Sequence, residues 1–199
     1  MQPSHVTDFR CLIWLWLMLS GCAVPAAAQT GVFEIPQLMQ ILAQVETRES
    51  AFTEKKILAL LTEPLISSGT LRYRRPNYVE RTTIAPRQER FIYENGKITI
   101  ESSGRQHQFH VKDQPSLGVL IESIRATLAG DEKTLQRHYQ LRLAGTRAHW
   151  DLEMLPVSSD LFSRTRLIRI SGAQDELRQI DILEASGDRT IMMINAIKR

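Results

Sequence analysis

Apolar and polar residues alternate along most of this chain with the two-residue period of a β-strand. Successive strand side chains point to opposite faces of a sheet, so this alternation predicts strands with one apolar and one polar face. The Asn-Gly pair within ENGK (94–97) predicts a tight hairpin between two of them. We place strands at about 51–61, 67–75, 78–84, 88–94, 97–102, 106–111, 138–144, 148–155, 165–171, 177–185 and 189–197.

Two segments instead repeat apolar residues at the three- and four-residue spacing of an amphipathic helix. The first is predicted from about 36 to 47, with Pro36 in its first turn. The second is PSLGVLIESIRATLAG (115–130), with Asp113 as a candidate cap and Gly130 as the stop. A further helical turn is expected in DEKTLQRH (131–138). The apolar stripe of the second helix consists of Leu117, Leu120, Ile121, Ile124 and Leu128.

About eleven strands and two amphipathic helices predict a mainly β (α+β) fold. The strands suit one long, curved antiparallel sheet with one solvated face. The other face must be covered, and the two helices are the available cover. No repeat or linker interrupts the pattern, so we expect a single domain over residues 29–199.

The first 28 residues have the layout of a secretory signal peptide. The nine-residue apolar run CLIWLWLML (11–19) is too short to span a membrane as a helix, and small residues follow it. Two cleavage sites stay open. AAA (26–28) suits ordinary signal peptidase and would release a soluble periplasmic protein that begins at Gln29. LSGC (19–22) matches a bacterial lipobox, which would remove residues 1–21 and leave an outer-membrane lipoprotein anchored through a lipidated Cys22.

Composition argues against several classes of function. Cys11 and Cys22 are the two cysteines, so the ordinary cut leaves neither a disulfide nor a cysteine-ligated zinc site. The formal net charge is only +3 and the arginines are scattered, which gives no support to nucleic-acid binding. A weak attraction to anionic lipid headgroups is compatible with this charge.

Candidate catalytic and metal-binding residues do not form a recognisable motif. His107 and His110 would point to opposite faces of their strand, so a shared metal ion is not expected. His149 and Asp151 share the polar face of another strand, but no serine or cysteine accompanies them in a nucleophile motif. We therefore expect no enzyme activity, no metal site and no cofactor.

The strand within GTLRYRRPN (69–77) carries one residue that breaks its pattern. Leu71, Tyr73 and Arg75 share one face, and the first two make that face apolar. Arg72 and Arg74 lie on the opposite face and suit solvent. Arg75 therefore places a guanidinium on the apolar side, and one explanation is a rim residue with its stem on apolar surface and its head in water.

Several segments resemble the periplasmic outer-membrane lipoprotein carriers, the LolA family. SGTLRYRRPNYVERTTIAPRQERFIYENGK (68–97) shares with that family a Gly-x-Leu strand, an Arg-Pro-Asn, a proline ten residues later and a turn ending in Gly-Lys. AFTEKKI (51–57) is similar to the family's Phe-Thr-Gln-Lys strand. SIRATLAGDEKTLQRHYQLRL (123–143) and LEASGDRTIMMI (183–194) resemble a compact LolA-related subgroup. The likeness spans residues 33–197.

The resemblance implies an incomplete antiparallel β-barrel of eleven strands around an apolar cavity, with a helical lid. It implies a periplasmic carrier that shields the acyl chains of lipoproteins, or of another acylated lipid, on their way to the outer membrane. Its partners would be that cargo, an inner-membrane exporter and an outer-membrane acceptor, and the carrier itself would be a monomer.

The resemblance also assigns roles to particular residues. It places Arg75 inside, as a latch whose guanidinium donates hydrogen bonds to lid backbone carbonyls in the closed state. Val79 falls at an apolar contact position, Leu71 and Tyr73 fall in the cavity wall, and the stripe from Leu117 to Leu128 becomes the inner face of the lid. One departure is Arg81, which stands where better-known carriers have an aromatic residue.

Two other functions stay open at this point. One is a tethered acceptor of the same fold (LolB-like), anchored in the outer membrane through Cys22. The other is a closed structural or accessory domain, in which the same apolar residues simply fill a core. Only a measured cavity separates lining residues from core residues.

Overall fold

The computed structural model describes residues 32–197, except for the side chains of Pro115 and Ser116. The predicted signal peptide, its two cleavage sites and Cys22 fall on residues 1–31, outside the described part. Among the helices that are described, none has the length and apolar composition needed to cross a membrane.

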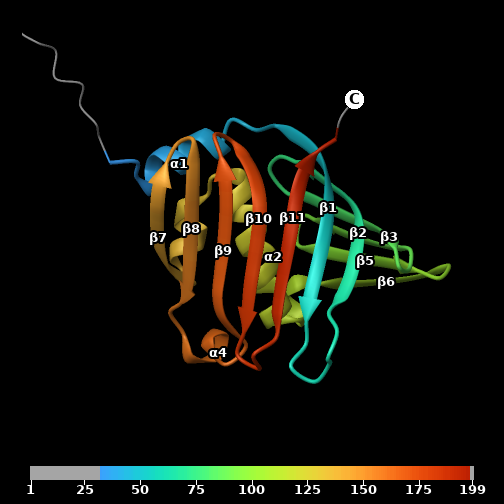
Figure 1. Ribbon diagram of the computed structural model, residues 1–199. Helices are drawn as coiled ribbons and strands as arrows, with labels where there is room; N and C mark the ends of the chain where they lie inside the picture. The colour runs from blue at the N-terminus through green and yellow to red at the C-terminus, as the bar shows by residue number, and fades with distance from the viewer. Residues whose placement is uncertain (1–31, 198–199) are drawn as a thin grey trace, which may run out of the picture. The chain divides into compact units, whose positions relative to one another are not determined.

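One antiparallel sheet of eleven strands forms most of the fold, in the order β6-β5-β4-β3-β2-β1-β11-β10-β9-β8-β7 (Figure 1). Neighbouring strands follow one another in sequence except β1 and β11, which join the two halves of the sheet. The edge strands β6 and β7 do not pair with each other, so the sheet stays open. The prediction of a mainly β fold with an incomplete antiparallel barrel is confirmed. The strands are β1 (Thr47–Ile57), β2 (Leu65–Arg74), β3 (Tyr78–Ala85), β4 (Glu89–Glu94), β5 (Lys97–Ser102), β6 (Arg105–His110), β7 (Tyr139–Thr146), β8 (His149–Pro156), β9 (Thr165–Ala173), β10 (Glu176–Glu184) and β11 (Arg189–Ala196).

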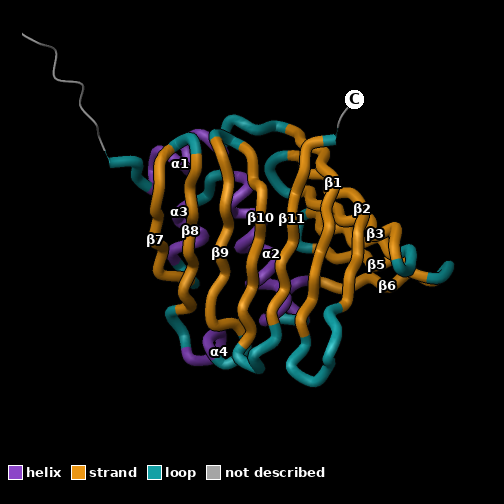
Figure 2. Tube along the Cα trace, viewed as in Figure 1, coloured by secondary structure: helices purple, strands orange, loops and turns teal. Residues whose placement is uncertain are grey.

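The helices cover one face of the sheet, as Figure 2 shows for α1, α2 and α3. Helix α2 ends at Gly130, whose left-handed backbone (φ 67°) suits glycine. A Cβ added to Gly130 would lie 2.2 Å from the carbonyl oxygen of Met39, so this glycine also lets α2 approach α1 closely. The helices are α1 (Ile35–Leu42), η1 (Val111–Asp113, a 3₁₀ turn), α2 (Pro115–Ala129), α3 (Glu132–Gln136) and α4 (Ser159–Phe162).

Some predicted boundaries are wrong. The first helix ends at Leu42 rather than near 47, and β1 begins at Thr47, four residues before the predicted strand. The inward residues at the start of β1 are Arg48 and Ser50, so no apolar alternation announces the strand there. Asp113 does not cap α2, because the N-cap residue is Gln114. The Asp113 carboxylate instead accepts a hydrogen bond from the backbone N–H of His110.

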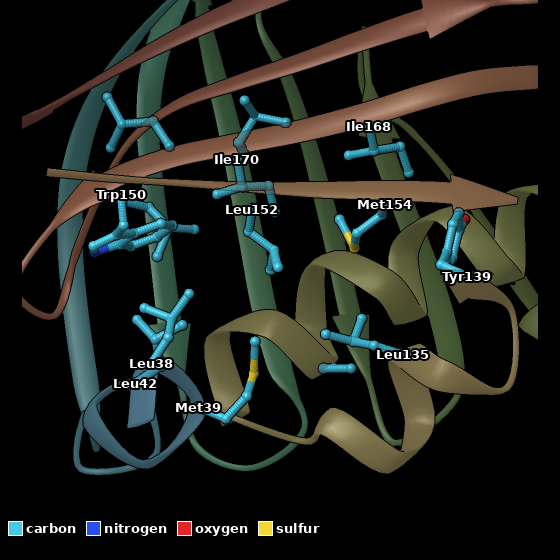
Figure 3. Packing of buried hydrophobic residues seen from close by; sticks show 14 residues of the cluster. Leu38, Met39, Leu42, Leu135, Tyr139, Trp150, Leu152, Met154, Ile168 and Ile170 are labelled. Carbon is cyan, nitrogen blue, oxygen red and sulfur yellow. The ribbon is translucent and has the colours of Figure 1, made fainter. Parts of the chain in front are cut away.

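Two separate hydrophobic clusters hold the helices on the sheet. The larger one packs α1 against β8 and β9, and Figure 3 shows Leu38 and Leu42 below Trp150, with Leu152 and Ile170 beside them. The smaller one contains Tyr93, Ile98 and Ile121, from β4, β5 and α2. The smaller cluster lies at β4 and β5, while the larger one extends from β8 and β9 to Leu177 and Ile180 of β10 and Ile194 of β11.

Candidate functional site

A cavity of about 600 Å³ lies between the middle of the sheet and helix α2. Strands β1, β2, β3, β10 and β11 supply one wall, α2 supplies the other, and Leu42 and Val45 line it near the end of α1. Its volume is within the range of ligand-binding pockets. The predicted apolar cavity beneath helices is present.

Helix α2 joins both hydrophobic clusters and also faces the cavity. It contributes Ala126 to the larger cluster and Ile121 to the smaller one. Its apolar stripe lines the cavity opposite the sheet.

The residues that the family resemblance assigns to the wall and the lid lie around this cavity. Arg75, which the resemblance assigns to a latch, is not among the lining residues. Leu71, Tyr73 and Val79 line it from β2 and β3, and the complete α2 stripe lines it from the opposite side. The stripe runs from solvent inward, since Leu117 is 37% exposed and Ile121 only 8%. The structure thus brings these side chains around one space.

Arg75 lies at the edge of the cavity, just beyond the end of β2. Its guanidinium donates a hydrogen bond to the backbone carbonyl of Ala43, the C-cap residue of α1. Its side chain is 35% exposed and lies 3.9 Å from the carboxylate of Glu46. The backbone N–H of Arg75 also donates to the carbonyl of Glu46, at 2.8 Å. Arg75 therefore connects β2 to the end of α1 and is not part of the wall.

Comparison with known proteins identifies the family of this chain. The family model described as "Outer membrane lipoprotein carrier protein LolA-like" matches residues 26–197. The chain belongs to this LolA-like family. It is 22% identical over 190 residues to an outer-membrane lipoprotein carrier protein of Pseudomonas putida (strain W619), covering 95% of this chain and 87% of that one. The family resemblance predicted from the sequence is confirmed.

Solved structures resemble this LolA-like chain at very low identity. One is a LolA superfamily protein from Nitrosomonas europaea, with 5% identity, a TM-score of 0.46, and coverage of 84% of this chain and 95% of that chain. Another is a DUF1329 family protein from Desulfovibrio piger, with 10% identity, a TM-score of 0.48, and coverage of 81% and 88%.

A buried arginine that the sequence reading missed fixes α2 in this LolA-like structure. Arg125 is 7% exposed and donates to Glu122 through Nε and Nη2, at 2.9 and 2.6 Å. The same guanidinium lies 3.3 Å from Asp131 and donates to the carbonyl of Pro76 at 3.2 Å. Glu122 also accepts a hydrogen bond from the hydroxyl of Tyr93, on β4. We call this set the α2 clamp; only the three-residue spacing of Glu122 and Arg125 could have indicated part of it.

The electrostatics of the α2 clamp favour its charged state. Burial by itself lowers the pKa of Arg125, but the hydrogen bond and charge of Glu122 outweigh burial, so the pKa is raised. The pKa of Asp131 is lowered; burial opposes that shift, while hydrogen bonds from Thr134 and Arg125 produce it. The clamp is therefore an ion-pair network at neutral pH.

Polar groups interrupt the apolar wall at two places. The Tyr73 hydroxyl is buried without a hydrogen-bond partner in the described part of the chain, and burial raises its pKa. Arg81, the departure noted in the sequence, donates to Glu54 at 3.0 Å and lies over the Phe52 ring, 4.9 Å from its centroid. The wall therefore combines a large apolar surface with fixed charges.

A second charged cluster lies away from the cavity, on the outer face of β3. Glu80 accepts two hydrogen bonds from Arg90, both 3.1 Å long, and others from Tyr78 and Thr82. The hydrogen bonds from Arg90 are the largest cause that lowers the pKa of Glu80 to about 2. This cluster ties β3 to β4 and supports the sheet.

The histidine and aspartate residues considered from the sequence do not gather into a metal-binding group in the described part of the chain. Residues 32–197 contain no group of three or more histidine, cysteine, aspartate or glutamate side chains arranged to hold a metal ion. His107 and His110 are exposed on β6. Asp151 accepts a hydrogen bond from the hydroxyl of Ser171 at 2.5 Å, on the solvent face of the sheet.

Proposed function

We propose that this protein carries the acyl chains of a lipoprotein, or of another acylated lipid, through the periplasm toward the outer membrane. The observation that carries the proposal is the apolar cavity between the sheet and helix α2, in a chain that belongs to the LolA-like carrier family. The α2 stripe would contact one side of the acyl chain, and Leu71, Tyr73 and Val79 the other. No cofactor or catalytic group is required for such a role.

The energies involved suit reversible binding. Burying an acyl chain contributes about 0.8 kcal/mol per CH₂, so one long chain supplies on the order of 10 kcal/mol. Opening the lid breaks a few hydrogen bonds, each contributing about 1 kcal/mol net and more when a charged donor is involved. The contact between Arg75 and the Ala43 carbonyl is the proposed latch. The free energy of burying the acyl chain can exceed that of the latch hydrogen bond. Re-formation of this hydrogen bond then favours release of the cargo.

Titration with a fluorescent fatty acid tests the carrier proposal. We expect saturable binding that Ile124→Trp weakens, because Ile124 lines the cavity and a larger side chain there fills it. Ile84→Trp is the matched control, since Ile84 is 57% exposed on β3. Thermal unfolding of both variants checks that they fold. Absence of saturable binding to the wild-type protein would end the carrier proposal.

A tethered outer-membrane acceptor is a second candidate, favoured by the sequence LSGC (19–22). The cavity would serve both functions equally, so the mature N-terminus separates them. Mass spectrometry of protein purified from its native envelope should find a chain starting at Gln29 for the soluble carrier. A chain starting at a lipid-modified Cys22 would instead support the acceptor.

A further inference from the structure

One part of the cavity wall carries more positive than negative charge. Glu54 and Lys56 lie two residues apart on β1 and face the cavity, and Arg81 faces it from β3. We call these three side chains the wall triad. Adjacent strand positions face opposite sides of a sheet, so a charged residue one position earlier or later would face solvent outside the cavity.

Within the wall triad, Arg81 forms an ion pair with Glu54, and Lys56 is the second cation. Arg81 Nη2 lies 3.0 Å from Glu54 Oε1, and the two side chains are only 27% and 16% exposed. Lys56 forms no ion pair within 4.0 Å with any residue of the described part. The wall triad therefore has a net charge of +1 beside an apolar space.

Arg81 also has a donor that the protein does not use. Its Nε–H is buried and has no hydrogen-bond partner among residues 32–197, although Nη2 is bound to Glu54 and to the hydroxyl of Ser67. Buried polar groups normally have partners, because leaving one unsatisfied costs free energy. A change in the Arg81 side-chain conformation would expose this donor to a ligand oxygen in the cavity.

The other charged residues around the cavity do not cancel this excess. Arg164 and Glu184 also line the cavity, where Arg164 precedes Thr165 and Glu184 pairs with it, and they have opposite signs. Near the start of β1, Arg48 is paired with Asp175. Arg72 is paired with Glu49.

A wall that met only alkyl chains would gain nothing from these charges. Removing a cation from water costs free energy unless an anion or several acceptors compensate it. We infer that the cargo is an amphiphile with a carboxylate or phosphate group close to its acyl chain. Lys56 and Arg81 bind that anion while the chain lies along the α2 stripe. This inference rests on the proposed carrier function and names the chemical class of its cargo.

Binding of matched ligands tests the inference. A dansyl-labelled undecanoic acid and its methyl ester share the chain and differ in charge. We expect the wild-type protein to bind the acid at least about tenfold more tightly than the ester, a difference of about 1.4 kcal/mol. Lys56→Met should abolish this preference. Lys55→Met, which changes the adjacent exposed lysine on the outer face of β1, should preserve it.

A variant with the opposite effect strengthens the test. Glu54→Gln removes the carboxylate of the wall triad, so it should increase the preference for the acid over the ester several-fold. Dodecyl phosphate and dodecanoate as competitors distinguish a phosphate from a carboxylate cargo. Inorganic phosphate, which lacks a chain, should not displace the probe.

Each result has a definite consequence. Equal affinity for acid and ester in the wild-type protein, or an unchanged preference in Lys56→Met, would overturn the anionic-cargo inference while the carrier proposal stands. If neither probe binds, the carrier proposal fails and the inference fails with it. Circular dichroism of each variant confirms that a loss of preference does not come from unfolding.

Discussion

The guanidinium of Arg125 donates a hydrogen bond to the backbone carbonyl of Pro76, 3.2 Å away, and so joins helix α2 to the turn between β2 and β3. Arg75, the residue before this proline, donates to the carbonyl of Ala43 at the end of α1. One short turn of the sheet is therefore tied to both long helices. These two contacts lie at the edge of the cavity and differ in burial, which gives them different expected roles.

Arg125→Met should destabilise the fold strongly. It leaves Glu122 and Asp131 without their cation; since these carboxylates are 30% and 37% exposed, water compensates part of the loss, and we expect a cost of about 2–3 kcal/mol. Urea unfolding measures the loss. Arg178→Met is the control, because the Arg178–Glu176 pair is exposed and 3.7 Å long, and its loss should cost less than about 1 kcal/mol. Similar losses in both variants would contradict a structural role for the α2 clamp.

Arg75→Leu should instead speed the exchange of cargo. The substitution removes the hydrogen bond to Ala43, which lowers the cost of moving α1 by about 1–2 kcal/mol and raises the rates of loading and release about 5- to 30-fold. Stopped-flow fluorescence with a fluorescent fatty acid measures these rates. Arg74→Leu, on the opposite face beside Glu94, should leave them unchanged. Identical rates in wild type and Arg75→Leu would refute the latch.

Acid should weaken the protein partly through Glu80. Its pKa is about 2 in the folded state against an ordinary 4.5, so the unfolded chain binds the proton more tightly. The resulting stability is complete above about pH 4.5 and is lost as the pH falls toward 2; its size is about 2–3 kcal/mol. Glu80→Gln should therefore show a flatter fall in unfolding free energy between pH 5 and 2.5.

A control variant isolates the effect of Glu80. Glu89→Gln changes an exposed carboxylate at the start of β4, and its pH dependence should follow that of the wild type. If Glu80→Gln also follows the wild type over this interval, the acid sensitivity arises elsewhere in the protein.

Gly172→Ala should disturb the larger cluster. A Cβ at this position would lie 2.2 Å from the Trp150 ring and 2.3 Å from the carbonyl oxygen of Glu176, so the ring or a strand must move, at a cost of about 1–3 kcal/mol. Urea unfolding followed by circular dichroism measures this, because that signal does not depend on Trp150. In a Trp150→Leu background, the added cost of Gly172→Ala should fall. An unchanged cost there would show that the ring is not the obstacle.

The sequence predicted the sheet well where one strand face is clearly apolar. In β8, Trp150, Leu152 and Met154 are buried and alternate with polar neighbours, so this alternation was sufficient to predict the strand. Helix α4 has only four residues, too few to show a helical period, and it was missed. The start of β1 was missed because polar side chains occupy its inner face there.

The site was predictable only in part. Leu71 in the cavity wall and Leu152 in the filled cluster look alike in sequence, because both alternate on an apolar strand face. The family resemblance, rather than periodicity, assigned Leu71 to the wall. Arg125 and Pro76 are far apart in the chain, and no local pattern indicates that a helix and a distant turn meet. The net charge of the wall triad likewise depends on which partners Arg81 and Lys56 find in three dimensions.

The pairing of β1 with β11 has a consequence for biogenesis. Phe52 and Ile194 are partners in this pairing, from opposite ends of the described chain, and both strands form the floor of the cavity. Contacts between such distant segments form slowly, because the intervening chain must first lose its freedom. For the proposed carrier function, a polypeptide that has not yet paired β11 with β1 has no enclosed space for lipid. Competence to receive cargo should therefore arise only after the last described strand has joined the sheet, so that folding precedes loading.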